Sequence, residues 1–191
     1  MDVTIIGTGF IGSTLGRALA SAGHVVTFGS RHPANEVVGW TGVVASIGDA
    51  VAASEVIILA MPGTAVAELA REVGSALAGK LVIDATNRMG EPVANSRSEL
   101  PPTIRYARAF NTLGGENFEN PVFPGGTADL FFSAPVADRA AVEEIVAAVG
   151  LGPVYVGEDQ EGLIEALFKL WIELAMKQGR GRHLAMKLVC D

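Results

Sequence analysis

The sequence predicts a doubly wound α/β fold with a mostly parallel β-sheet, and three observations support that prediction. Apolar runs of strand length alternate with helical patterns up to Asn87, and the joints between them are short. The apolar runs are continuous rather than alternating, which is typical of a parallel sheet covered on both faces. The first apolar run also leads directly into a glycine-rich turn.

The first β-α-β unit has a clear pattern. The run VTII at residues 3–6 predicts a buried strand, and residues 24–31 (HVVTFGSR) predict a second strand. Between them, residues 13–23 place Leu15 and Leu19 on one face of a helix, together with two alanines.

The alternation continues to Asn87 and then loosens. Further strands are expected at residues 42–46, 55–62 and 80–87. Helical segments are expected at residues 48–54 and 64–77. Residues 88–102 carry prolines and Gly90 among polar residues, which predicts a long loop.

The second half contains fewer regular elements. Strands are expected at residues 103–111, 130–134 and 153–157. Helices are expected at residues 138–150, opened by Asp138, and at residues 161–178. We expect residues 1–157 and a helical extension, residues 158–191, to fold as one compact domain.

Composition and charge exclude several classes of function. The chain of 191 residues has 14 basic and 21 acidic residues, a net charge of -7, which argues against nucleic acid or an anionic membrane as a partner. Cys190 is the one cysteine, so no disulfide can form within the chain, which fits a reducing cytoplasm. No basic segment precedes the first strand, and no apolar run approaches the ~20 residues of a membrane span.

Gly7, Gly9 and Gly12 have the spacing G-x-G-x-x-G at the end of the first strand. In this motif the first glycine permits a tight turn, the second lets the backbone approach a pyrophosphate, and the third lets the helix pack closely on the strand. The N–H groups of the first helical turn then face the anion. An ordinary glycine-rich turn is the alternative, but the position between a strand and a helix favours a Rossmann-type dinucleotide-binding domain over residues 1–157.

The end of the second strand indicates which dinucleotide is bound. An NAD site usually has Asp or Glu there, which binds the ribose 2′-hydroxyl. This strand instead ends in Gly29, Ser30, Arg31 and His32. A hydroxyl and a guanidinium would bind a 2′-phosphate, so the expected cofactor is NADP, unless Arg31 is a solvated turn residue.

Several segments resemble the NADPH-dependent coenzyme F420 reductases. They are GTGFIGSTLGRALASAGHVVTFGSR, LAMPGTAV, VIDATN, RAFNTLGGENFENP and the C-terminal LFKLWIELAMKQGRGRHLAMKLV. The resemblance covers nearly the whole chain. It implies that the backbone of Thr8, Gly9, Phe10 and Ile11 holds the pyrophosphate, and that the serine and arginine after the second strand hold the 2′-phosphate.

The resemblance also places residues along the rest of the cofactor. Met61, Pro62 and Ala65 would lie along the ribose and nicotinamide, and Asn87 would also line the cofactor. The residues implied at the nicotinamide end, where a second substrate stacks, are Asn111, Thr112 and Gly115. These segments follow the carboxyl ends of expected strands, where ligands bind in open α/β sheets. Met61 could instead fill the core, and the two asparagines could instead complete tight turns.

The sequence contains no Ser-His-Asp set, metal-ligand cluster or pair of carboxylates, so no catalytic residue and no metal ligand is assigned. Hydride transfer needs none, because the reacting atoms belong to the cofactors and the protein orients them and excludes water. We expect hydride transfer between NADP(H) and F420 or a flavin-like acceptor. The alternatives are a non-catalytic NADPH-binding module that senses redox state, and an NADPH reductase of another small substrate.

The helix at residues 161–178 has an apolar arc over about half its circumference, wider than one core contact requires. A polar stripe at i, i+4 spacing contains Glu165, Lys169, Glu173 and Lys177. A homodimer through this helix is expected, or a contact with substrate, and a deeply buried core helix is the alternative. The basic stretch at residues 177–183 suits the anionic tail of F420, or is a solvated turn.

Overall fold

The computed structural model of the protein describes residues 1–35, 37 and 39–189. Cys190 lies outside the described residues. The chain divides into two compact units, Met1–Ala107 and Arg108–Asp191. The domain boundary expected after residue 157 stays a prediction.

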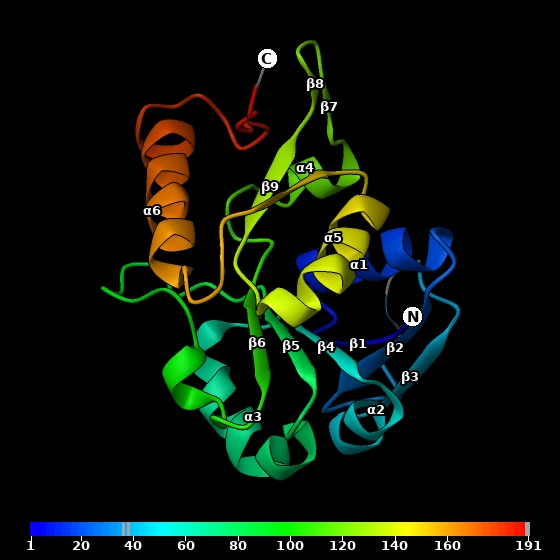
Figure 1. Cartoon of the computed structure of the whole chain (residues 1–191). Coiled ribbons are helices and arrows are strands. Elements are labelled where there is room, and N and C mark those ends of the chain that lie inside the picture. The colour runs from blue at the N-terminus through cyan, green and yellow to red at the C-terminus, as the bar shows by residue number, and fades with distance from the viewer. Residues whose placement is uncertain (36, 38, 190–191) are drawn as a thin grey trace. The chain divides into compact units, whose positions relative to one another are not determined.

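The first unit is built on a six-stranded sheet with the order β3-β2-β1-β4-β5-β6 (Figure 1). The strands are β1 (Asp2–Ile6), β2 (Val25–Ser30), β3 (Val43–Ser46), β4 (Val56–Leu59), β5 (Leu81–Asp84) and β6 (Arg105–Arg108). Neighbouring strands from β3 to β5 pair in parallel. The predicted doubly wound α/β fold is confirmed, and its strand order reverses beside β1, where such sheets bind ligands.

Helices cover both faces of this sheet. Helix α1 (Phe10–Ser21) packs on one face, and α2 (Ile47–Ala53) and α3 (Val66–Val73) pack on the other (Figure 1). Alternate side chains of each strand enter opposite cores, which explains the continuous apolar runs of the sequence. On one face, Gly16 of α1 lies so close to Phe28 that a Cβ atom would overlap the ring. On the other, β1, β4 and β5 share a core with α2 and α3.

Helix boundaries differ from those expected from sequence, most clearly in α1 and α3. Helix α1 begins at Phe10 rather than at residue 13, because Gly9 takes the N-cap position inside the glycine motif. The helix expected at residues 64–77 consists of α3 with a 3-10 turn at each end, Gly63–Ala65 and Gly74–Leu77. Such tight turns are frequent at helix ends.

The second unit has short elements. Strands β9 (Asp129–Phe132) and β10 (Gly152–Tyr155) pair in parallel, and β7 (Val122–Phe123) and β8 (Gly126–Thr127) form a hairpin. The helices are α4 (Glu116–Glu119), α5 (Arg139–Ala148) and α6 (Glu161–Ile172), which continues into a wide π-type turn, Glu173–Lys177. The sequence did not predict helix α4 or the hairpin of β7 and β8, because elements this short show no periodicity.

Helix α6 carries a buried apolar face formed by Ile164, Phe168 and Trp171. The polar stripe expected on this helix is only partly exposed. Glu173 and Lys177 form the ion pair expected from their spacing, at 2.9 Å, but Glu165 is only 8% exposed. Among the described residues, no helix is long and apolar enough to cross a membrane.

The basic stretch at residues 177–183 makes contacts within the second unit. Arg182 Nε lies 2.5 Å from Glu116 Oε1, and the ring of His183 stacks on Phe123 with centroids 4.3 Å apart. Burial raises the pKa of Glu116, but the hydrogen bond and charge of Arg182 outweigh it, so the pKa lies below its ordinary value. These contacts leave less of the stretch available to an anionic ligand than the sequence suggested.

Candidate functional site

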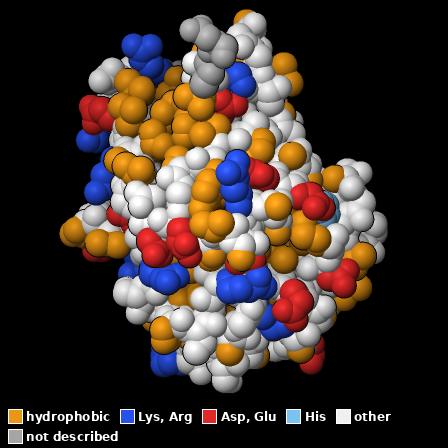
Figure 2. Space-filling model, in the orientation of Figure 1, with side chains coloured by type: hydrophobic (Ala, Val, Ile, Leu, Met, Phe, Trp, Pro, Cys, Tyr) orange, Lys and Arg blue, Asp and Glu red, His pale blue; other side chains and the backbone are white. Residues whose placement is uncertain are grey.

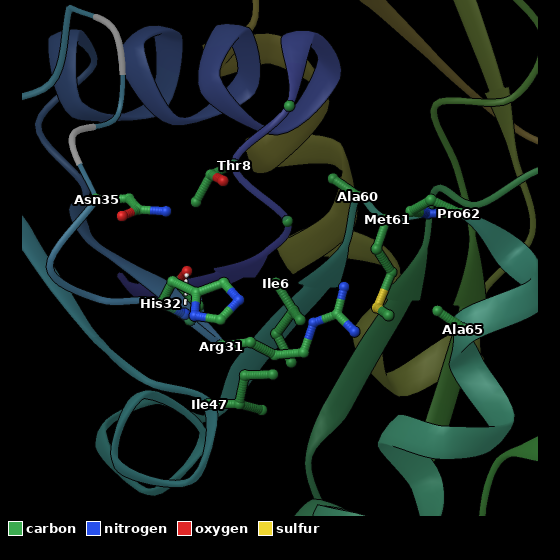
Figure 3. A pocket seen from close by; sticks show the side chains of 14 residues that line it. Ile6, Thr8, Arg31, His32, Asn35, Ile47, Ala60, Met61, Pro62 and Ala65 are labelled. Carbon is green, nitrogen blue, oxygen red and sulfur yellow. Dashed lines mark hydrogen bonds between the residues drawn. The ribbon is translucent and has the colours of Figure 1, made fainter.

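A cleft of about 310 Å³ opens in the first unit, where β1, β2 and β4 end (Figure 3). Its lining comes from the carboxyl ends of these three strands and the turns that follow them, with one side chain, Ile47, from the start of α2. This is the topological switch point of the sheet, and the volume lies in the range of small-molecule sites.

The glycine motif forms the floor of the cleft through close backbone packing. Gly7 has φ +117, and a Cβ atom there would overlap the carbonyl oxygen of Ala60 at the end of β4. A Cβ atom at Gly12 would overlap the carbonyl oxygen of Gly7. Gly9 differs, because no atom lies within 4 Å of a Cβ built there. The outer two glycines therefore serve packing, and the middle one leaves space for a ligand.

The amino terminus of α1 offers backbone donors at the same place. Gly9 is the N-cap, it makes no side-chain capping hydrogen bond, and no acidic residue lies in the first turn. The first intrahelical bond runs from the N–H of Ser13 to the carbonyl of Gly9, at 2.9 Å. The N–H groups of Phe10, Ile11 and Gly12 therefore have no partner within the helix and suit an anion.

The turn after β2 gives the cleft its polar side. The Ser30 hydroxyl accepts a hydrogen bond from the N–H of His32, at 3.0 Å, and keeps its own O–H as a donor. Figure 3 shows the Arg31 side chain reaching across the cleft toward Met61. Among the described residues that line the cleft, none is a carboxylate. This side therefore favours a doubly charged phosphate over a ribose hydroxyl.

Two polar lining residues were not among the sites expected from sequence, namely His32 and Asn35. The N–H of Asn35 donates to the carbonyl of His32 at 3.0 Å, so residues 32–35 form a tight turn. Figure 3 shows Asn35 facing Thr8 across the cleft. The segment HPAN, with proline at its second position, was the available turn signal.

The turn after β4 forms the opposite side of the cleft. Met61, Pro62 and Ala65 all line it, as expected. Met61 also packs against the core under α2 and α3. The two interpretations of Met61, core filler and cofactor contact, are therefore compatible.

The remaining expected site residues do not line this cleft, and they include Phe10, Ile11 and Gly12 at the start of α1. Asn87 follows β5, beyond the lining segments. Asn111, Thr112 and Gly115 belong to the second unit, where all three are buried. Phe110, just before them, has a positive φ of 67, a conformation that costs free energy in a non-glycine residue and is typical of functional segments. Their roles toward a ligand stay predictions.

No metal centre is present in the described part of the chain, because no group of three or more His, Cys, Asp or Glu side chains could hold an ion there. The described lining of the cleft presents backbone N–H groups, the hydroxyls of Thr8 and Ser30, the Arg31 guanidinium and the His32 imidazole, and no carboxylate. These features define a Rossmann-type site for a phosphate-bearing dinucleotide.

Comparison with known proteins agrees with this class. Residues 2–88 match the family model described as "NADP oxidoreductase coenzyme F420-dependent". Over these residues the chain is therefore similar to this family of NADP-dependent oxidoreductases, which is the family predicted from the sequence.

Solved structures extend the likeness to the whole chain. A candidate F420-dependent NADP-reductase from Arthrobacter sp. FB24 is 23% identical over 100% of both chains, with a TM-score of 0.80. Hypothetical protein SMa0349 from Sinorhizobium meliloti is 26% identical over 100% of this chain and 96% of its own, with a TM-score of 0.69. A reductive aminase from Aspergillus terreus, solved with NADPH, is 22% identical over 91% of this chain but only 61% of its own, with a TM-score of 0.68.

Proposed function

We propose that the protein transfers a hydride between NADP(H) and a deazaflavin of the F420 type. The observation that carries the cofactor assignment is the turn after β2, where Ser30 and Arg31 line the cleft and no described lining residue is a carboxylate. The family name and the name of the Arthrobacter protein support the deazaflavin as acceptor.

The chain's own groups would bind and orient the cofactor. The N–H groups at the start of α1 would hold the pyrophosphate, and Ser30 and Arg31 would hold the 2′-phosphate. The bound dinucleotide supplies the hydride. Met61 and Pro62 would then present one ring face to the acceptor and keep water from the other, so that positioning supplies the catalytic effect.

Two other functions remain as candidates. The imine reductase and reductive aminase neighbours have related folds and act on other small substrates, which favours an NADPH reductase with a different acceptor. A non-catalytic NADPH-binding module is the second candidate, because the described lining of the cleft contains no carboxylate that could form an acid–base pair with His32.

One absorbance experiment separates these candidates. The protein is mixed with NADPH and, in separate reactions, with oxidised F420, FMN, FAD or a cyclic imine. We expect rapid loss of F420 absorbance and slow or no reduction of the others. Reduction of the imine or a flavin in preference to F420 would replace the acceptor, and tight NADPH binding without any turnover would favour the binding module.

We also propose that the protein pairs as a homodimer through α6. Leu163, Leu167, Leu170 and Leu174 recur at the four-three-four spacing of helices that pair. Leu163 is 51% and Leu170 is 46% exposed, and Figure 2 shows apolar side chains gathered over α6 and the C-terminal segment. Light scattering should give twice the monomer mass, and Leu163→Glu with Leu170→Glu should halve it, whereas a monomeric wild-type protein at high concentration would rule out this pairing.

A further inference from the structure

Arg88 connects two loops that follow neighbouring strands of the sheet. It stands after β5, at the start of the long loop at residues 88–102. Its Nη2 donates a hydrogen bond to the carbonyl oxygen of Gly63, at 3.2 Å, and forms an ion pair with Glu99. The side chains of Arg88 and Glu99 are only 20% and 24% exposed, so this pair is largely withdrawn from water.

The contact with Gly63 depends on the absence of a side chain there. A Cβ atom at Gly63 would lie 2.7 Å from Arg88 Cγ and 3.3 Å from the carbonyl oxygen of Asn87. Gly63 follows Pro62, and the N–H of Ala65 donates to the carbonyl of Pro62 at 2.9 Å. The guanidinium therefore holds the same turn that forms one side of the cleft.

The loop that carries Arg88 has a firm base. The buried carboxylate of Asp84 accepts hydrogen bonds from the N–H groups of Thr86 and Ser96, both at 2.9 Å, and from the hydroxyl of Tyr106, at 2.8 Å. The N–H of Arg88 donates to the carbonyl of Ala94 at 3.2 Å. Arg88 thus extends to the turn after β4 from a loop whose base is fixed by hydrogen bonds.

Strand order shows which half of a dinucleotide this bridge would affect. The glycine motif follows β1, and the 2′-phosphate side follows β2. Strands β4 and β5 lie on the other side of β1, so a dinucleotide whose pyrophosphate lies at α1 extends its nicotinamide half toward them. Arg88 and Gly63 connect these two strand ends.

We propose that Arg88 is a positioning residue that fixes the turn at residues 61–65 for the nicotinamide half of the cofactor. The inference rests on the proposed binding of NADP(H), and it does not depend on the hydride acceptor. Its consequence is selective. Loss of the bridge weakens ligands that contain the nicotinamide half and spares ligands that end at the adenosine half.

Calorimetric titration of two ligands tests this selectivity. NADPH contains both halves, and 2′,5′-ADP contains only the adenosine half with its phosphates. Arg88→Gln removes a charge-assisted hydrogen bond and an ion pair, so the Kd for NADPH should rise roughly 10-fold. The Kd for 2′,5′-ADP should not change, and Arg88→Lys should recover part of the NADPH affinity.

Matched controls come from the same unit. Arg105 Nε donates to the carbonyl of Gly79 at 2.9 Å, so Arg105→Gln removes a similar arginine–carbonyl bond. Glu55→Gln is the control for Glu99→Gln, because it makes the same change of side chain in an ion pair of the first unit, with Lys80, at a carboxylate that is 80% exposed. Neither control should change NADPH affinity, whereas Glu99→Gln should weaken NADPH binding.

The outcomes separate the two proposals. If wild-type protein binds 2′,5′-ADP but not NADPH, both the proposed function and the Arg88 bridge are wrong. If the wild-type protein binds NADPH and Arg88→Gln binds it equally well, the bridge alone is wrong. If Arg88→Gln weakens both ligands alike and lowers the melting temperature, Arg88 serves stability rather than positioning.

Discussion

Each of the two units of the chain is stabilised internally by a different kind of contact. In the first, backbone ladders between parallel strands and two helical layers make the framework, and the cleft lies at the strand ends. In the second, the described strands form two separate pairs, and side chains make many of the long-range connections. The periodicity of apolar residues in the sequence predicts the strands and helices of the first unit, but it predicts few of the side-chain contacts of the second.

The segment after Lys177 shows the second kind of construction best. Asn117 Nδ2 donates to the carbonyl oxygens of Gly114 and Arg182, at 3.0 and 3.2 Å, and Trp171 Nε1 donates to the carbonyl of Leu184 at 2.9 Å. The Asp129 carboxylate accepts bonds from Lys187 Nζ and from the N–H of Leu188, both at 2.7 Å. A segment with almost no regular structure is thereby tied to α4, β9 and α6.

The largest expected effect tests the framework of the first unit. Gly12→Ala should destabilise the protein by about 3 kcal/mol and abolish NADPH binding, because the new Cβ atom overlaps the carbonyl oxygen of Gly7 and forces α1 outward. Urea unfolding and NADPH fluorescence measure the two losses. As a control, Gly48→Ala in α2 adds a Cβ with no atom within 4 Å and should raise stability.

The second prediction concerns charge in the cleft rather than framework. Arg31→Asp should weaken NADPH roughly 100-fold, because a charge-assisted hydrogen bond is replaced by repulsion of the 2′-phosphate. NADH, which lacks that phosphate, should bind this variant at least as well as it binds the wild type. Fluorescence titration measures the affinity of both proteins for both cofactors. Equal affinity of the wild-type protein for NADH and NADPH would contradict the NADP assignment.

The third prediction moves to the side-chain connections of the second unit. Asn117→Ala should lower the free energy of unfolding by about 2 kcal/mol, because it removes the side-chain donor to the partly buried carbonyl of Arg182 and one of the two donors to the buried carbonyl of Gly114. Asn120→Ala, at an exposed position nearby, should cost little. Affinity for 2′,5′-ADP, whose expected contacts lie in the first unit, should stay unchanged, and a parallel loss there would erase the contrast between the units.

The smallest effect is a pH dependence in the same unit. The pKa of Glu116 is lower in the folded protein than its ordinary value of 4.5, so its pairing with Arg182 stabilises the fold above that value and is lost as pH falls through the folded pKa. Both side chains are well exposed, which limits the contribution to about 0.5 kcal/mol. Glu116→Gln should be slightly less stable than wild type at pH 7 and equal to it in acid, and high salt should remove the difference.

Much of the first unit was predictable because each of its features is local in sequence. The glycine motif, the residues after β2 and the family resemblance together pointed to eight residues that do line the cleft, namely Gly7, Thr8, Gly9, Ser30, Arg31, Met61, Pro62 and Ala65. His32 and Asn35 were missed as lining residues, because their approach depends on the turn at residues 32–35 rather than on periodicity. Gly63 and Arg88 are 25 residues apart, and nothing local indicates that they touch.

The second unit was less predictable for the same physical reason. The cations near residue 180 suggested an anion site, but Arg182 and His183 contact Glu116 and Phe123, sixty or more residues earlier. Glu165 was placed on a polar stripe by its spacing, and tertiary packing buries it. Side-chain contacts of this range have no periodic signature, so only the folded chain reveals them.

Met61 packs against the core and also lines the cleft, so its side chain can serve as a probe of whether the cleft is occupied. Its thioether methyl group gives a single sharp signal in a carbon-13 spectrum. A planar ring bound beside it would shift that signal through its ring current, and a bound molecule would shield the sulfur from peroxide. Occupancy of the cleft can thus be followed on unmodified protein. The same methyl signal also responds to changes in the packing of the core against α2 and α3.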